Sequence, residues 1–483
     1  MRRRVNCVPI IVLVLLTVEV GARSSSKAGE VVLIPLADAM PVLRALPDSL
    51  PEALRSLPEA ELAGAWPKWT AQRNREIRER LARGDEDTLT NFLLFGTSFT
   101  REPRLTLAAL DRAREKSGGN LEPDSPVVAA VRKRAEDLAR AASASGQNER
   151  LEFSRRVLKR NSFNLATDEG RAKAVAYLLQ HFEETLREND RYAELLKAAQ
   201  LENDRNRELV TRSTLFKTRG VSLDTSWQPN LAIEKSLAAL KEKGLLSAGG
   251  VRRVAVIGPG LDFTDKEEGY DFYAPQTVQP FAVLDSLMQL GLAKGESLGV
   301  TTLDLSERVN DHIARARKRA AAGAGYTIEL TLNPAVHWQP EALNYWRQWG
   351  SRIGVNVAPV QPPADLGRIE MRALKVQPAF VLRVVPRDVN VVMERLRFDD
   401  PDERFDVVIA TNVLVYYDLF EQALALQNIA AMLRPGGFLL SNDALVEVRA
   451  GALHSAGSTL VSYSDRKEDA DFVNWYQNSG PRE

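Results

Sequence analysis

The sequence is poor in the residues that build disulfides and metal centres. Its 483 residues include one cysteine, Cys7, and four histidines, which are His181, His312, His337 and His454. One cysteine excludes an intrachain disulfide, a cysteine-rich zinc site and a cysteine nucleophile in the body of the chain. The histidines are scattered and show no ligand spacing such as H-E-x-x-H. We therefore predict no metal site and no metal-dependent hydrolase.

An excess of charge of one sign is also absent. Lysine and arginine together number 64, aspartate and glutamate together number 64, and the formal net charge is zero. A balanced charge gives no general attraction to the phosphate backbone of nucleic acids. We therefore do not expect nucleic acid as a partner.

Long hydrophobic runs are missing except near the start of the sequence. Three arginines at residues 2–4 precede an apolar run over 8–18, and small residues follow at 20–22. This is the layout of a secretory signal peptide, and the run is short for a membrane span. We predict a signal peptide over residues 1–22, a secreted or periplasmic protein, and no stable membrane span after its removal. The alternatives are an N-terminal anchor, or a start codon placed too early on a cytoplasmic protein.

The first half of the chain is rich in helical periodicity. Apolar residues recur at three- and four-residue spacing, and acidic and basic residues are mixed on the other faces. We predict an all-helical domain over residues 31–217, followed by a linker and lead-in helix over 218–244. The most periodic segments are 73–83, 125–142, 170–189 and 192–210.

From residue 245 onward the pattern changes to strands that alternate with helices. Such alternation predicts a doubly wound parallel sheet. The last two strand-like runs, 458–464 and 471–478, flank a charged turn and predict an antiparallel hairpin. The predicted fold is α/β, with a doubly wound seven-stranded sheet over residues 245–483, an antiparallel last hairpin, and the all-helical domain in front. Further strands are expected over 251–258, 298–306, 404–414 and 438–443, and helices over 276–292, 306–322 and 417–437.

The regular alternation is interrupted at about residues 323–403. Strand-like runs at 326–332 and 378–396 flank an aromatic-rich predicted helix over 341–354 and a proline-rich loop over 359–367. We interpret this stretch as the third strand of the sheet plus an insertion. His337 and Trp338 lie in the insertion, where they are either a structural pair or reach the ligand site.

A glycine-rich turn follows the first strand, in the stretch VAVIGPGLDF (254–263). Gly258, Pro259 and Gly260 lie where a strand of such a sheet ends, which is the ligand-binding edge. Glycine lets the backbone approach a ligand closely and permits a positive φ. A dinucleotide-binding turn needs a third small residue, and Phe263 occupies that position.

Acidic residues follow this turn. Asp262 and the carboxylates between 265 and 271 would repel phosphate groups by about 1 kcal/mol or more each at protein-like dielectric. A cofactor without phosphates and with positive charge suits the loop better. S-adenosylmethionine, with its sulfonium and amino groups, meets both conditions. Asp304 ends the second strand, where a carboxylate accepts hydrogen bonds from ribose hydroxyls.

The segments VAVIGPG, LDLSE, FDVVIATNVLVYYD and IAAMLRPGGFLLSND, in this order, resemble the Rossmann-like (class I) S-adenosylmethionine-dependent methyltransferases. The resemblance covers residues 245–483 and does not reach the helical half. Within it, NVLVYY is similar to the matching segment of chemotaxis-receptor methyltransferases. The fold, the cofactor and methyl transfer to an unidentified acceptor are what this resemblance implies.

The resemblance also implies roles for individual residues. Gly258 and Gly260, with Pro259 between them, would face the methionine part of the cofactor, and Asp304 would hold the ribose. Further cofactor contacts are expected from Asp388 or Val389 near adenine, and from Asn412 near methionine and the acceptor.

One position departs from the family pattern. Val256 stands two residues before the first glycine, where the family has an acidic residue. Asp262 or a carboxylate of 265–271 is then the expected partner of the cofactor amine. If neither serves, the chain is a non-catalytic binding protein on a degenerate methyltransferase fold.

Methyl transfer needs alignment of the acceptor with the methyl group more than it needs a catalytic triad. Tyr416, Tyr417 and Asp418 follow Asn412 and are our candidates for orienting the acceptor, which we expect to be a small molecule or a protein side chain. The alternative for the two tyrosines is packing at the start of the next helix. The Asn-Pro-Pro-aromatic signature of base and amide methylation is absent. A nicotinamide- or flavin-dependent oxidoreductase remains a third, weaker interpretation.

Overall fold

The computed structural model describes residues 29–105, 110, 112–113, 125–144, 146, 148–201, 226–264, 270–443, 445, 451–466 and 469–480. The predicted signal peptide lies outside these residues, as do residues 218–225 of the predicted linker and the acidic residues of 265–269. Along the described chain, no helix combines the length and the apolar composition that a membrane crossing requires.

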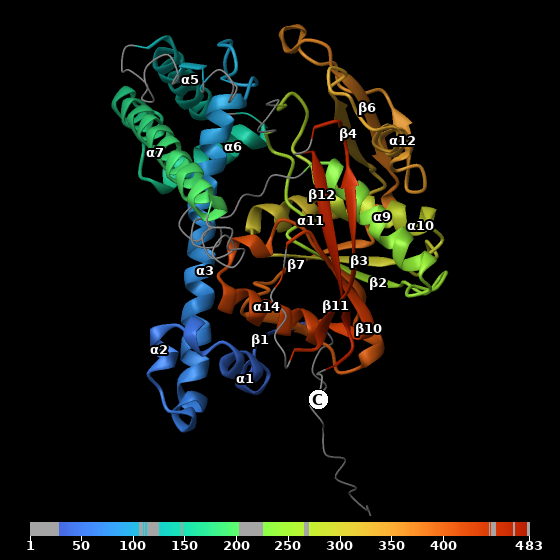
Figure 1. The fold of residues 1–483 in the computed structure, drawn as a ribbon. Helices are drawn as coiled ribbons and strands as arrows, with labels where there is room; N and C mark the ends of the chain where they lie inside the picture. Colours follow the sequence, from blue (N-terminus) through green and yellow to red (C-terminus); the bar gives the residue numbers. More distant parts are fainter. Residues whose placement is uncertain are drawn as a thin grey trace, which may run out of the picture.

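Seven strands form the main sheet, in the order β11-β12-β10-β9-β2-β3-β7 (Figure 1). The pairs β7–β3, β3–β2, β2–β9 and β9–β10 are parallel, whereas β12 runs antiparallel to both β10 and β11. This confirms the predicted α/β fold, a doubly wound seven-stranded sheet with an antiparallel last hairpin. The strands are β2 (Arg253–Ile257), β3 (Gly299–Asp304), β7 (Val384–Asp388), β9 (Phe405–Ala410), β10 (Leu433–Ser441), β11 (Leu453–Ser462) and β12 (Ala470–Asn478).

Both faces of the sheet are buried, and strand β2 shows how the residues divide. Val254 and Val256 pack into one apolar cluster with helices α9 (Gln228–Glu242), α10 (Gln279–Gln289) and α11 (Glu307–Ala321). Ala255 and Ile257 point to the other face, which α14 (Leu419–Met432) and the N-terminal helices cover. Burial on both faces explains why this strand reads as a continuous hydrophobic run.

The insertion forms a small sheet of its own. Strands β4 (Tyr326–Leu332), β6 (Glu370–Val376) and β5 (Gly354–Val357) pair antiparallel in the order β4-β6-β5. Helices α12 (Pro340–Gln348) and α13 (Pro378–Val381) complete this segment. The third strand of the main sheet is β7, in the second of the two strand-like runs expected here.

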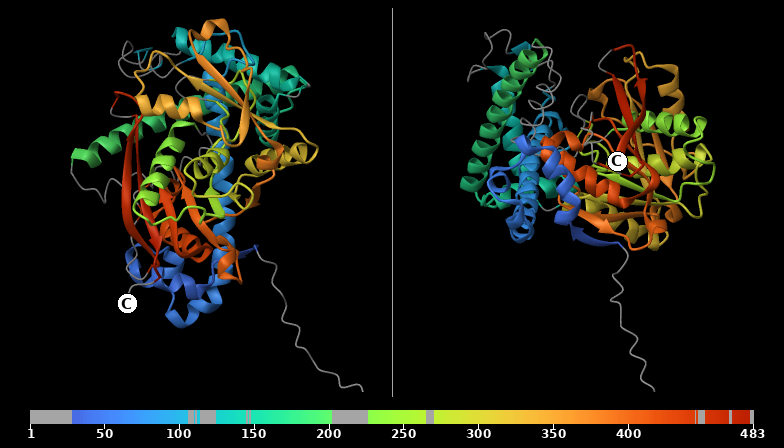
Figure 2. Two further views of the ribbon diagram at one scale, coloured as in Figure 1. Left: turned by 90° about the vertical axis from the view of Figure 1, so that its right-hand side faces the viewer. Right: turned by 60° about the horizontal axis from the view of Figure 1, so that its bottom comes forward.

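The helical half lies beside the sheet, as Figure 1 and the right-hand view of Figure 2 show. Its helices, as the structure describes them, are α1 (Leu36–Ala45), α2 (Glu52–Arg55), α3 (Glu59–Phe95), α5 (Pro126–Ser143), α6 (Glu149–Arg160) and α7 (Asp168–Leu201). Side chains cap three of them: Ser125 accepts a hydrogen bond at the start of α5, Asn148 does so at the start of α6, and Thr167 does so at the start of α7.

Helix α3 belongs to both halves of the molecule. Leu62, Trp66 and Ile77 in its first part pack on the sheet together with α14. Leu89 and Phe92 near its end lie in the core of the helical half, with α5, α6 and α7. The two halves therefore share one continuous element.

The first strand differs from the sequence-based expectation. Strand β1 (Glu30–Leu33) pairs antiparallel with β8 (Glu394–Arg397), in a stretch where we expected helices only. Four residues are too few to show a strand period. Helix α9 lies within the segment 218–244, for which a linker and a lead-in helix were predicted; Pro229 is in its first turn, where proline is well tolerated.

Candidate active site

A cavity of about 820 Å³ lies at the carboxyl ends of β2, β3, β9 and β10. This is the edge at which doubly wound sheets bind ligands. We call its wall near strand β3 the β3 side, formed by Leu81, Asp304, Leu305, Val389 and Tyr417. We call the opposite wall the hairpin side, formed by Trp227, Glu329, Trp338, Tyr463 and Asp471.

The glycine turn forms part of the cavity wall between these two sides. Gly258 and Gly260 both line the cavity and both have a positive φ, of 61° and 65°. The amide of Gly258 donates to the carbonyl of Leu303, so the turn is tied to the neighbouring strand. A Cβ at Gly258 would lie 2.6 Å from the side chain of Val413. Pro259 is buried but does not belong to the lining residues that the structure describes.

Asp304 presents a carboxylate to the cavity from the end of β3. Its Oδ1 accepts the backbone amide of Ser306 at 2.7 Å. Its Oδ2 is buried and has no hydrogen-bond partner among the described residues. Burial raises the pKa of Asp304 to about 7, and the Ser306 amide and then Arg308 act in the opposite direction. A buried acceptor without a hydrogen-bond partner lowers the stability of the fold, because its lost hydration is not replaced. A ligand hydroxyl that donates to this oxygen would restore the hydrogen bond.

Asn412 lies where β9 ends, in a strained backbone conformation. Its φ is 55°, which non-glycine residues seldom adopt and which concentrates at functional sites. Asn442 holds it there: the Asn442 side chain accepts the Asn412 amide at 2.7 Å and donates to Asn412 Oδ1 at 2.9 Å. Next to this pair, Asp443 accepts the Leu414 amide, and burial raises the pKa of Asp443 to about 6.

Asp262 lines the cavity after the glycine turn. Its Oδ2 accepts the Tyr273 hydroxyl at 2.8 Å and the Gln276 amide at 2.9 Å. Gln276 in turn exchanges two hydrogen bonds with the backbone of Glu329, which joins this loop to strand β4. Val256, at the family's acidic position, is fully buried between sheet and helices and offers no polar contact.

Asp271 does not face the cavity, contrary to its place among our candidates for the cofactor amine. Its carboxylate accepts the amides of Thr97 and Ser98 and the Thr97 hydroxyl, all from the helical half. The same loop inserts Phe263 into the core of the helical half, where it packs against Phe92 and Phe153. This explains why the third small residue of a dinucleotide turn is an aromatic here: its role is to anchor the loop.

The two residues expected near adenine point to different places. Val389 lines the cavity and is buried. Asp388 has a side chain 62% exposed and forms an ion pair with Arg78 of α3 at 2.7 Å. The Asp388 contact is thus with the helical half, whereas Val389, the first residue after β7, lines the cavity.

The three candidates for orienting the acceptor also separate. Tyr416 and Tyr417 line the cavity. Tyr417 is buried, and the guanidinium of Arg80 lies 5.5 Å from its ring centre. Asp418 is the N-cap of α14: it accepts the Glu421 amide at 2.8 Å, and Glu421 accepts the Asp418 amide in return. This capping box accounts for Asp418 without a catalytic role.

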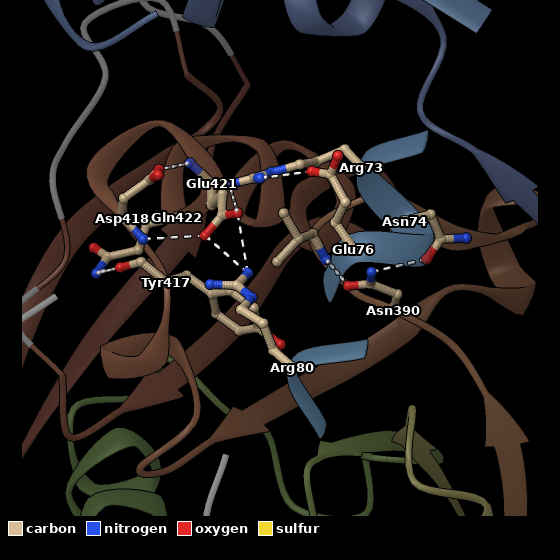
Figure 3. A network of polar contacts seen from close by, with 10 residues as sticks. Arg73, Asn74, Glu76, Arg80, Asn390, Tyr417, Asp418, Glu421 and Gln422 are labelled. Atoms are coloured by element: carbon tan, nitrogen blue, oxygen red, sulfur yellow. Dashed lines mark hydrogen bonds and ion pairs between the residues drawn. The ribbon is translucent and has the colours of Figure 1, made fainter. Parts of the chain in front are cut away.

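A polar network joins α3 to the β3 side (Figure 3). Glu421 is buried and accepts hydrogen bonds from Arg73 at 2.7 Å and from Arg80 at 3.0 Å. A second part of the network links Asn74 with Asn390, whose side chain donates at 2.8 Å. Because Leu81 on the same helix lines the cavity, α3 contributes directly to the wall.

Apart from Trp338, the residues of the hairpin side were missed in the sequence, because they come from three distant segments. Trp227 and Trp338 lie with ring centres 5.4 Å apart, and their indole N–H groups donate to backbone carbonyls of Thr331 and Asn333. The bridge between Trp338 and Ser464 brings the last hairpin to this wall.

Acidic side chains complete the hairpin side. The Tyr463 hydroxyl donates to Asp471 Oδ2 at 2.6 Å. Glu329 is buried, and burial raises its pKa. Two signals in the sequence pointed here: Trp338, one of whose two interpretations was a place at the ligand site, and the lone acidic residue in the apolar run YTIELTL. His337, by contrast, is exposed and pairs with Asp465 outside the lining.

No group of three or more potential metal ligands occurs within the described part of the chain. The cavity carboxylates accept hydrogen bonds from amides and hydroxyls instead. Asp469 in addition forms an ion pair with Arg466.

Solved methyltransferases resemble this fold. They include an O-methyltransferase family protein from Burkholderia thailandensis (12% identity, 77% of this chain and 98% of that one, TM-score 0.26) and the carbon methyltransferase CurJ (13%, 93% and 100%, 0.25). The glycopeptide N-methyltransferase MtfA is 14% identical over 53% of this chain and 78% of its own, with a TM-score of 0.21. No family model and no curated protein matches the chain. Such low identities and TM-scores identify no family, so the residues of the cavity have to decide the function.

Proposed function

We propose that the protein is an S-adenosylmethionine-dependent methyltransferase. The observation that carries this proposal is Asp304, which lines the same cavity as Gly258 and Gly260 and whose buried Oδ2 has no hydrogen-bond partner among the described residues. Ribose hydroxyls are donors and suit this acceptor, whereas phosphates do not suit a wall with six carboxylates and one arginine.

Each part of the cofactor has a proposed binding residue in the cavity. Asp304 would accept the ribose hydroxyls, and Val389 and Leu305 offer apolar surface to adenine. The N-terminal residue of α10, Gln279, lines the cavity, where the partial positive charge of a helix start suits the cofactor carboxylate. Asp262 is the proposed partner of the cofactor amine in place of Val256.

The cofactor, when bound, supplies a methyl carbon activated by a positively charged sulfur. The chain has to align the acceptor with that carbon and to exclude water, which together lower the barrier by several kcal/mol. Asn412, fixed by Asn442, and the Tyr416 side chain lie where the strand ends meet and are the proposed positioning groups. The same acidic wall repels nucleic acid, so a small molecule or a protein side chain remains the proposed acceptor.

Calorimetric titration of the purified protein with S-adenosylmethionine, S-adenosylhomocysteine and NADH tests the proposal. We expect micromolar binding of the adenosyl ligands, weakened about a hundredfold in Asp304→Ala because charged hydrogen bonds are lost. Gly260→Val should abolish the binding of the adenosyl ligands, because the positive φ of 65° at this position is strongly unfavourable for valine. Asp402→Ala is the matched control, since this exposed aspartate precedes β9 at the opposite edge of the sheet.

Each alternative predicts a different result. A binding signal with NADH and with neither adenosyl ligand would favour the oxidoreductase. No heat with any of the three ligands would favour a binding protein on a degenerate fold.

A further inference from the structure

We propose that Tyr273 and Gln276 are positioning residues for the cofactor amine: they hold the carboxylate of Asp262 in the orientation in which it binds that amine. This inference rests on the proposed function, in which Asp262 is the partner of the amine. It is carried by two hydrogen bonds that converge on one carboxylate oxygen, and by the separate parts of the molecule that fix the two donors.

The first observation is the geometry at Asp262. Its Oδ2 accepts the Tyr273 hydroxyl at 2.8 Å and the Gln276 side-chain amide at 2.9 Å, and all three residues line the cavity. A carboxylate has about four acceptor sites, so these two bonds do not by themselves saturate it. Both donors are neutral, and they therefore orient the carboxylate without forming an ion pair with it.

The second observation is that the side chain of Gln276 is fixed by strand β4. The side chain is buried, its Nε2 also donates to the carbonyl of Glu329 at 2.8 Å, and its Oε1 accepts the Glu329 amide at 2.8 Å. The backbone of Gln276 exchanges two further hydrogen bonds with Asp262, at 2.7 and 3.4 Å. A rotated side-chain amide would lose both bonds to Glu329 and would place an acceptor against the Asp262 carboxylate. The insertion thus keeps this donor directed at Asp262.

The third observation is that the helical half fixes the backbone of Tyr273. Arg150 of α6 is buried, and its guanidinium donates to the carbonyls of Phe263 and Tyr273. Arg150 also attracts Asp262 electrostatically, while its described hydrogen bonds go to these two carbonyls. Because the backbone is held in this way, the Tyr273 hydroxyl reaches Asp262 from a fixed point. The helical half thereby takes part in recognition of the amine.

A carboxylate that is already ordered gives tighter binding, because little side-chain freedom is lost when the ligand arrives. Without its two donors, Asp262 would have to be ordered by the ligand itself. The consequence is selective. Loss of either donor should weaken ligands that carry the amine and should leave ligands without it nearly unchanged.

The test compares S-adenosylhomocysteine with deaminated S-adenosylhomocysteine, in which a hydrogen atom replaces the amino group. Calorimetric titration of both ligands into each variant forms a double-mutant cycle, which separates the contribution of the amine from general changes in the cavity. We expect the wild type to bind S-adenosylhomocysteine about tenfold more tightly than the deaminated ligand, because the latter lacks one charged hydrogen bond. Asp262→Asn should remove most of this preference.

Two variants and a control assign the positioning role. Tyr273→Phe removes one hydroxyl, and Gln276→Met removes the hydrogen-bonding groups of a side chain of similar length. Each should reduce the preference for the amine about threefold, while the affinity for the deaminated ligand changes by less than about twofold. Tyr463→Phe is the matched control, because it removes a tyrosine hydroxyl that donates to another aspartate of the cavity, Asp471, at 2.6 Å. The preference should persist in this control.

The possible outcomes separate this inference from the proposed function. A preference that stays intact in both Tyr273→Phe and Gln276→Met overturns the inference, as does an equal loss of affinity for both ligands, which a purely structural role predicts. A preference that survives in Asp262→Asn also overturns it, because the amine then has another partner, although cofactor binding itself stands. If the wild type binds neither ligand, the proposed function fails.

Discussion

The two sides of the cavity are built in different ways. The β3 side consists of residues at or after strand ends together with Leu81 of helix α3, and Arg73 and Arg80 tie this helix to Glu421 of α14. The hairpin side consists of side chains from the residue before α9, from β4 and its following loop, and from the last hairpin. The β3 side therefore depends on ion pairs with the helical half, whereas the hairpin side depends on contacts among segments of the sheet domain. This difference indicates that substitutions on one side can be made without disturbing the other.

The largest expected effect comes from breaking the support of the β3 side. Glu421→Ala leaves the buried Arg80 without its carboxylate and should cost about 3–5 kcal/mol of unfolding free energy. Urea unfolding of the two proteins measures the difference. Glu76→Ala is the control: this glutamate pairs with Arg73 near the surface and should cost about 1 kcal/mol or less. Similar losses in both variants would contradict a special role for Glu421.

Asp304 provides a pH test of the β3 side. Burial raises its pKa from 3.8 to about 7, so protonated Asp304 stabilises the fold. That contribution is complete below the unfolded pKa and is lost as the pH rises through 7. Asp304→Asn cannot ionise, so without ligand its melting temperature should fall less than that of the wild type between about pH 5 and pH 8. If the melting temperatures of the two proteins change equally with pH over this range, Asp304 is not the group whose ionisation lowers the stability.

A smaller effect is expected from Arg78, which contacts Asp388 at 2.7 Å and Glu394 at 2.9 Å. These pairs are partly exposed, so Arg78→Ala should cost about 1 kcal/mol of stability. The loop that carries Val389 lies between the two partners, and S-adenosylhomocysteine affinity should fall severalfold. Arg44→Ala, which removes an exposed ion pair with Glu59, should leave this affinity unchanged.

The smallest expected effect is on the hairpin side. Trp338→Leu should change the affinity for S-adenosylhomocysteine by less than about twofold, because the side-chain contacts described for Trp338 are with Asn333 and Trp227, which are not proposed to hold the nucleoside. Calorimetry measures this directly. A loss comparable with that in Arg78→Ala would show that the two sides are coupled.

The sequence predicted the parts of the site that follow readable strands. Gly258, Asp304 and Asn412 come directly after buried hydrophobic runs, and all three line the cavity, although their roles stay predictions. Asp388 and Val389 could not be separated, because choosing between neighbours requires the orientation of β7 and the position of Arg78. The sequence predicted where the strands lie better than it predicted the directions in which their side chains point.

The hairpin side could not be derived from the sequence. Trp227, Trp338 and Tyr463 meet only because the insertion lies against the last hairpin, and no local pattern encodes that contact. Nor does local pattern reveal that Phe263 belongs to the core of the helical half. Both depend on packing between segments far apart in the chain, for which a single sequence carries no periodic signal.

Helix α3 is translated long before the segments of the chain that it packs against. Its partner Glu421 lies 348 residues after Arg73, and β1 pairs with residues 394–397. A ribosome therefore releases the first hundred residues long before the surfaces that receive them exist. Until nearly the whole chain has been translated, the apolar face of α3 that carries Trp66 and Ile77 has no sheet to cover. Exposed apolar surface of this kind is what chaperones bind, so the N-terminal segment is where we expect the nascent chain to need them.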